Sequence, residues 1–93
     1  MDGPLADLPG ADLVYRGVND LAAGRRSVEA FLVSRASARL RSCGVPVVQP
    51  LPDADGGLYR LLAERDATGA HSAYNALTRR LVAFMHAAEL HAP

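Results

Sequence analysis

The stretch AHSAYNALTRRLVAFMHAAEL, residues 70–90, decides the fold of this chain. Its apolar side chains recur at alternating steps of four and three residues, at Ala70, Tyr74, Leu77, Leu81, Phe84 and Ala88. This spacing places them on one side of an α-helix that would span about 30 Å at about 1.5 Å per residue. We therefore expect a long C-terminal helix around which the rest of the chain is assembled.

An amphipathic segment near the N-terminus predicts a first helix. It begins at Asp12, a candidate N-cap, and ends near Gly24. Its apolar side consists of Leu13, Val14, Val18 and Leu21. Gly17 lies in the middle of that side, where it costs up to about 1 kcal/mol relative to alanine. Close approach of a neighbouring helix would compensate for this cost.

A second helix is predicted from Ser27 to Ser42, with Gly44 as its terminator. Plotting residues at 100° steps gives it two apolar faces. One face carries Leu32, Val33, Ala36 and Leu40. An adjoining strip carries Val28, Phe31, Arg35 and Arg39, and we expect this strip to be an interface with another molecule.

The segment 45–52 contains three prolines and is expected to be an extended connector packed by Val47, Val48 and Leu51. A turn over residues 53–57 and a short third helix to Arg65 follow. We therefore predict an all-α fold, a small four-helix bundle-like domain over residues 1–93 whose first ten residues are flexible. Its expected core joins Tyr74, Leu77, Leu81, Phe84 and Met85 to the apolar sides of the two N-terminal helices.

Composition limits the class of protein. Hydrophobic residues make up 49% of the chain, which excludes disorder, and no apolar run approaches the roughly 18 residues of a membrane-spanning helix. The ten arginines, present without lysine, balance ten acidic residues, so no net charge attracts nucleic acid or a membrane. The first ten residues lack the basic and apolar regions of a secretory signal, and we expect a cytoplasmic protein.

Polar residues on one flank of the C-terminal helix are the main candidates for a ligand site. His71, Asn75, Arg79 and His86 follow a drifting stripe beside the apolar side. An imidazole, an amide and a guanidinium in line could bind an anion such as phosphate; the alternative is a solvated helix surface. No two histidines are three or four residues apart, so we expect neither a metal nor a cofactor.

The segment Arg80-Leu-Val-Ala-Phe-Met-His86 resembles the loose Arg-x(4–6)-His pattern of the HEPN family of small helical bundles. Many members of that family are RNases that act as dimers. The resemblance implies that Arg80 would stabilise phosphate charge and that His86 would act on the ribose hydroxyl or the leaving group. No other catalytic residues are expected.

Residues 21–45 carry five arginines and one acidic residue, which leaves Arg-mediated nucleic-acid binding as an alternative to pairing with the acidic first segment. The function that we predict is a non-enzymatic helical interaction module without a membrane anchor. Its partner is a second copy of the chain or another protein, docked on the strip that contains Val28 and Phe31. The alternatives are the helical RNase and the nucleic-acid-binding protein.

Overall fold

The computed structural model describes residues 5–91, and these residues are all-helical, as predicted, with no strand among them. The helices are α1 (Ala11–Ala22), α2 (Val28–Arg35), α3 (Ser37–Ser42), α4 (Ala54–Arg65) and α5 (Ala70–His91). There are thus five helices in this part of the chain, where four were predicted. The predicted second helix is divided into α2 and α3, and the other helices lie close to their predicted places.

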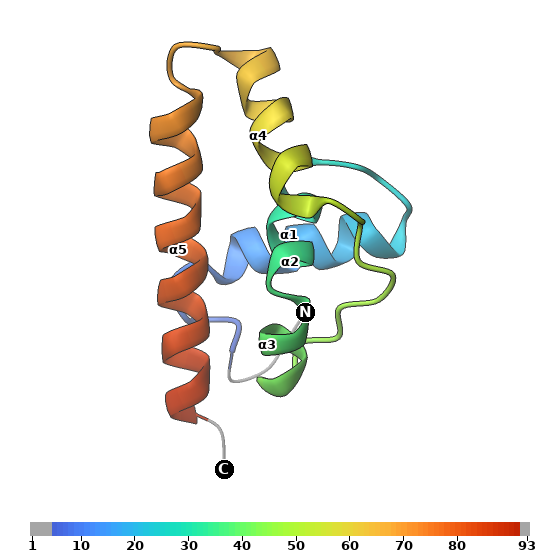
Figure 1. Ribbon diagram of the computed structural model, residues 1–93. Coiled ribbons are helices and arrows are strands. Elements are labelled where there is room, and N and C mark those ends of the chain that lie inside the picture. The colour runs from blue at the N-terminus through green and yellow to red at the C-terminus, as the bar shows by residue number, and fades with distance from the viewer. Residues whose placement is uncertain (1–4, 92–93) are drawn as a thin grey trace.

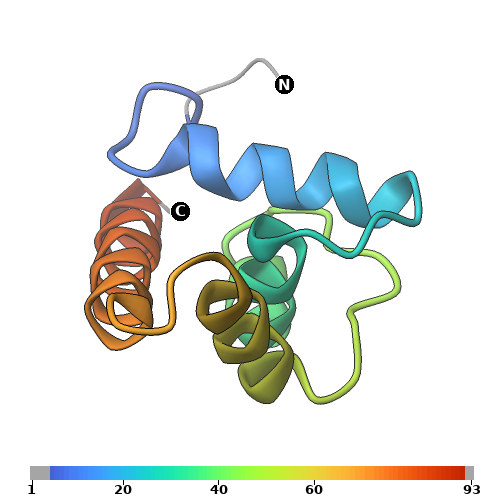
Figure 2. The ribbon, with the colours of Figure 1, turned by 90° about the horizontal axis from the view of Figure 1, so that it is seen from above.

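α4 and α5 form an antiparallel pair, and α1 crosses the molecule at its back instead of running along α5 (Figure 1). Viewed from above, α2 lies between α1 and α4, while α5 closes the remaining side (Figure 2). The arrangement is compact, with a radius of gyration of 12.7 Å. The side of α2 that was expected to be exposed is therefore covered by another helix of the same chain.

The division between α2 and α3 falls at Ala36, whose backbone dihedrals of φ −115° and ψ 26° leave the helical region. Two residues earlier, the Ser34 hydroxyl donates to the Ala30 carbonyl at 2.7 Å, a bond that tends to bend helices. The Ser34 oxygen also accepts a hydrogen bond from the amide of Leu51 at 2.9 Å. Ser34 thus joins the helix break to the segment that connects α3 to α4.

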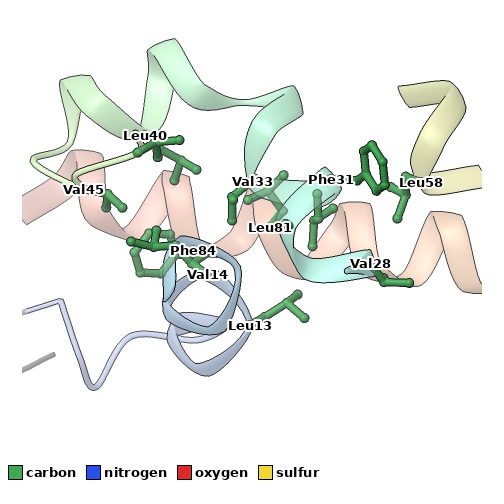
Figure 3. Packing of buried hydrophobic residues seen from close by; sticks show 14 of the residues in the cluster. Leu13, Val14, Val28, Phe31, Val33, Leu40, Val45, Leu58, Leu81 and Phe84 are labelled. Atoms are coloured by element: carbon green, nitrogen blue, oxygen red, sulfur yellow. The ribbon is translucent and has the colours of Figure 1, made fainter. Parts of the chain in front are cut away.

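One cluster of buried residues forms the core, shown in part in Figure 3. On α5 the buried residues are Ala70, Leu81, Phe84, Met85 and Ala88, while Tyr74 and Leu77 are half-buried against the cluster. All four predicted apolar residues of α1 are buried, as are Leu32, Val33 and Leu40. The apolar spacing predicted along α5 is confirmed, because the residues that it places on one side of the helix are all buried or half-buried against the other helices.

Val28 and Phe31 are only 3% and 4% exposed, so the expectation that they form an exposed apolar strip is wrong. The Phe31 ring points toward Leu58 of α4 (Figure 3). It also packs on Gly57, where a Cβ atom would lie 2.7 Å from the ring carbons Cδ1 and Cζ. Residues 54–57, predicted as a turn, are the first turn of α4, and the missing side chain at Gly57 makes room for the ring.

Gly17 is the point of closest approach between α1 and α2, as its place on the apolar side predicted. A Cβ atom there would clash with the Glu29 carbonyl oxygen and would lie 2.8 Å from Val33 Cγ1. The two helix backbones can meet only because residue 17 has no side chain.

The first described residues, 5–10, form turns that lead into α1. The Leu8 amide donates to the Leu5 carbonyl at 3.2 Å, and both leucines are half-buried against the core. Gly10, with φ +80°, is the N-cap of α1, so Asp12 is a first-turn residue and not the cap that was expected. The flexibility predicted for residues 1–4 lies outside the described residues.

The connector between α3 and α4 packs through a different set of side chains from the one expected. Val45 and Val47 are buried, and Leu51 is half-buried. Val48, which was expected to pack against the helices, is instead exposed.

Candidate interaction surface

Arg35 joins three helices at one point. Its Nε atom pairs with Asp55 Oδ1 of α4 at 2.8 Å, and its NH1 group donates to Thr78 Oγ1 of α5 at 3.1 Å. Its Cζ atom lies 4.9 Å from the ring centroid of Tyr74, a cation–π contact. Only 22% of the Arg35 side chain is exposed, so its geometry is fixed by these contacts from α4 and α5.

Tyr74 completes this cluster. Its hydroxyl donates to Asp55 Oδ1 at 2.5 Å, and its ring lies 5.8 Å from that of Tyr59 at an interplanar angle of 58°. The hydrogen bond to Asp55 raises the pKa of Tyr74, because ionisation would remove the donor and place two negative charges together. The phenol therefore acts here as a hydrogen-bond donor that holds α5 to α4.

Two exposed apolar side chains lie beside the cluster. Tyr59 is 42% exposed and Val82 is 44% exposed. Val82 follows Thr78 by one helical turn, and Thr78 follows Tyr74 by another, so the three form one ridge of α5. We call the surface made by Arg35, Asp55, Tyr59, Tyr74, Thr78 and Val82 the junction patch.

The predicted polar stripe of α5 runs beside the junction patch. His71, Arg79 and His86 are exposed and Asn75 is half-buried. Within residues 5–91 none of these four side chains has a hydrogen bond or salt bridge to another residue. Because Arg79 is three residues before Val82 and four after Asn75, these side chains are neighbours on the helix surface. We call His71, Asn75, Arg79 and His86 the outer flank.

Arg80 and His86, the pair suggested by the HEPN resemblance, lie on different sides of α5. At 100° per residue, six residues turn the helix by about 240°. The Arg80 NH2 group pairs with Asp12 Oδ1 of α1 at 2.9 Å, and this hydrogen bond lowers the pKa of Asp12. The guanidinium that the resemblance would assign to a phosphate thus already has a carboxylate partner.

Two arginines of the arginine-rich segment, Arg35 and Arg39, pair with acids far away in the sequence. Arg39 holds both carboxylate oxygens of Glu89 at 2.8 Å, which raises the pKa of Arg39 and lowers that of Glu89. Burial raises the pKa of the nearby Cys43 thiol. Within residues 5–91, Arg25 is the one arginine of these five that pairs with the acidic first segment, through Asp20. These contacts favour a structural role for Arg25, Arg35 and Arg39.

Arg25 and Ser27 both bind Asp20 in the loop between α1 and α2. The Ser27 hydroxyl donates to Asp20 Oδ2 at 2.5 Å, and Arg25 Nε donates to Oδ1 at 2.8 Å. These two bonds lower the pKa of Asp20, which is 9% exposed. The Ser27 oxygen also accepts from the Ala30 amide at 3.0 Å, so the N-cap of α2 is fastened to the end of α1.

Of the four predicted interface residues, only Arg35 belongs to the junction patch. Asp55, Tyr59 and Thr78 were not predicted as site residues, because no local motif marks them and their partners are distant in the sequence. Tyr74 was assigned to the apolar side of α5, and its hydroxyl gave no separate signal. Only the packing of α4 against α5 brings these polar groups together.

No helix within residues 5–91 is both long and apolar enough to cross a membrane. No three histidine, cysteine, aspartate or glutamate side chains of these residues are grouped so that they could hold a metal ion. Comparison of the chain with protein-family models, with curated proteins and with solved structures gives no match.

Proposed function

We propose that this protein is a non-enzymatic helical interaction module that binds another protein chain through the junction patch. The observation that carries the proposal is a pair of exposed apolar side chains near the fixed group of Tyr74 and Arg35: Tyr59 packs beside Tyr74, and Val82 lies two turns further along α5. Tyrosine and arginine are enriched among the residues that contribute most to binding energy at protein interfaces. This patch offers both types together.

Preorganisation supports the same proposal. Ordering a long side chain on binding costs about 0.5–1.5 kcal/mol. Arg35 is already held by Asp55, Thr78 and the Tyr74 ring, so a partner that packs on it would not bear that cost. A preordered arginine stacked on an aromatic ring therefore favours binding over an equally exposed but mobile one.

Site-specific photo-crosslinking tests the proposal in cells that produce the protein naturally. A photoreactive phenylalanine replaces Tyr59 in one variant and Val82 in a second. Matched controls carry it at Glu64, which is exposed on the same helix as Tyr59, and at Ala22, which is exposed at the end of α1. We expect both patch positions to give the same crosslinked chain, identified by mass spectrometry, and the controls not to give it.

The outcome that would overturn the proposal is absence of a defined product, or equal yields from patch and control positions. Crosslinking to a second copy would instead identify the module as self-associating, and sedimentation equilibrium would then show a dimer. As a further check, Val82→Asp should reduce the Tyr59 crosslink by about tenfold or more, the effect of losing one important apolar contact. Because Val82 is exposed, this variant should stay folded within about 0.5 kcal/mol of the parent.

A further inference from the structure

We infer that the partner presents an acidic segment, whose carboxylates face Arg79 on the outer flank while its apolar side chains pack on the junction patch. This inference rests on the proposed function, because it names the chemistry of the partner of that same surface. The observation behind the inference is a positive charge on the outer flank that has no carboxylate partner within residues 5–91.

The charged side chains of α5 differ in whether they form an ion pair. Glu89 is the one acidic residue of α5, and Arg39 binds both of its carboxylate oxygens at 2.8 Å. Arg80 is paired with Asp12 of α1. Arg79, in contrast, has no carboxylate within salt-bridge distance in the described part of the chain and is exposed. The outer surface of α5 therefore carries a positive charge that no group of residues 5–91 balances.

The junction patch itself does not select the sign of a partner's charge, because Asp55 neutralises Arg35. The outer flank does select a negatively charged partner. Beside Arg79 it offers the Asn75 amide and the imidazoles of His71 and His86, groups that can donate hydrogen bonds, and it contains no acid. A carboxylate is the common protein group that accepts two parallel hydrogen bonds from a guanidinium.

The dimensions fit a short segment. From His71 to His86 the outer flank extends about 22 Å along α5 at about 1.5 Å per residue. A partner helix of about 15 residues would follow this length and could turn one apolar side toward Val82 and Tyr59. Its acidic side would then lie over Arg79 and Asn75.

Fluorescence anisotropy with two designed peptides tests the inference. The probe is a fluorescein-labelled peptide of about 16 residues, built of leucine and glutamate so that one helical face is apolar. Its counterpart has lysine in place of every glutamate. We expect the glutamate peptide to bind, the lysine peptide to bind at least about tenfold more weakly, and the affinity of the glutamate peptide to fall with added salt.

Two charge reversals give a matched comparison. Arg79→Glu should weaken the glutamate peptide by about tenfold or more, and should improve binding of the lysine peptide. Arg65→Glu, which changes an exposed arginine at the end of α4, should leave both affinities within about twofold. Equal affinities for the two peptides, no binding of the glutamate peptide, or an unchanged affinity in Arg79→Glu would overturn the inference.

The crosslinking assay separates this inference from the function on which it rests. If Tyr59 and Val82 give a defined product whose yield is the same in Arg79→Glu, the interaction module stands and the acidic partner is refuted. If neither position gives a product, the proposed function is refuted, and so is the inference that rests on it. If the product forms and Arg79→Glu reduces it while Arg65→Glu does not, both are supported.

Discussion

Replacing Gly17 by alanine should destabilise this protein, although alanine is the better helix former. In an isolated helix the change would gain up to about 1 kcal/mol. In the folded chain the new methyl group would clash with the Glu29 carbonyl oxygen and lie 2.8 Å from Val33 Cγ1, where ordinary contact begins at 3.4 Å. α1 and α2 must therefore separate by at least about 0.6 Å, and gaps of about 0.5–1 Å lose a quarter to a half of the dispersion energy of each contact.

The expected magnitude follows from these opposing terms. Overpacking costs about 1–3 kcal/mol, and the upper end applies here because the closest atom belongs to the backbone and cannot rotate away. Subtracting the gain in helix propensity leaves a net loss of about 2 kcal/mol in the free energy of unfolding. For a domain of this size that corresponds to a melting temperature about 8–16 °C lower.

Urea and thermal unfolding followed by circular dichroism measure this change. Gly56→Ala is the matched control, because Gly56 also lies in a helix but its nearest neighbours are the oxygens of the exposed Asp53 side chain, which can move away. We expect the control to be as stable as the parent or slightly more stable. A Gly17→Ala protein at least as stable as the parent would refute the close helix crossing.

Three further predictions follow from the packing and from the charges. Phe31→Ala should cost about 3–5 kcal/mol in urea unfolding, because the ring is buried within the chain; a folded variant of parental stability would contradict this. The pKa of Asp20 is held below its ordinary value of 3.8 by hydrogen bonds from Ser27 and a guanidinium, so its contribution to stability is complete above pH 3.8 and is lost as the pH falls through the lower folded-state value. The parent should therefore lose more stability than Asp20→Asn between about pH 5 and about pH 2, and equal shifts in urea midpoint would count against the assignment. Arg80→Ala should cost at most about 1 kcal/mol, since its ion pair is exposed. The Arg80→Ala/His86→Ala protein should thus stay folded and match the parent in an RNA-cleavage assay, and activity present only in the parent would favour the RNase alternative.

The apolar spacing along α5 was sufficient to predict this helix, from residue 70 to residue 90, against an observed end at His91. The same local pattern predicted which side of α1 is buried and that a helix approaches Gly17. These predictions succeed because helical periodicity depends on residues only three or four positions apart.

The break at Ala36 could not be predicted in this way. It is accompanied by a hydrogen bond from the Leu51 amide to Ser34, which joins residues that are distant in the sequence. The error at Phe31 has a similar origin. The sequence indicates that its ring must be buried, but an apolar strip can be covered equally well by a second molecule or by another helix of the same chain.

The sequence by itself determined the helical class, the apolar sides of α1 and α5, and the polar residues that form the outer flank, because each of these depends on spacing within one helix. Only the tertiary structure decided that α4 covers Phe31 and that Arg35 meets Asp55 and Tyr74. The physical reason is that side-chain pairing depends on how whole helices cross, and the crossing is set by the combined packing of elements far apart in the chain.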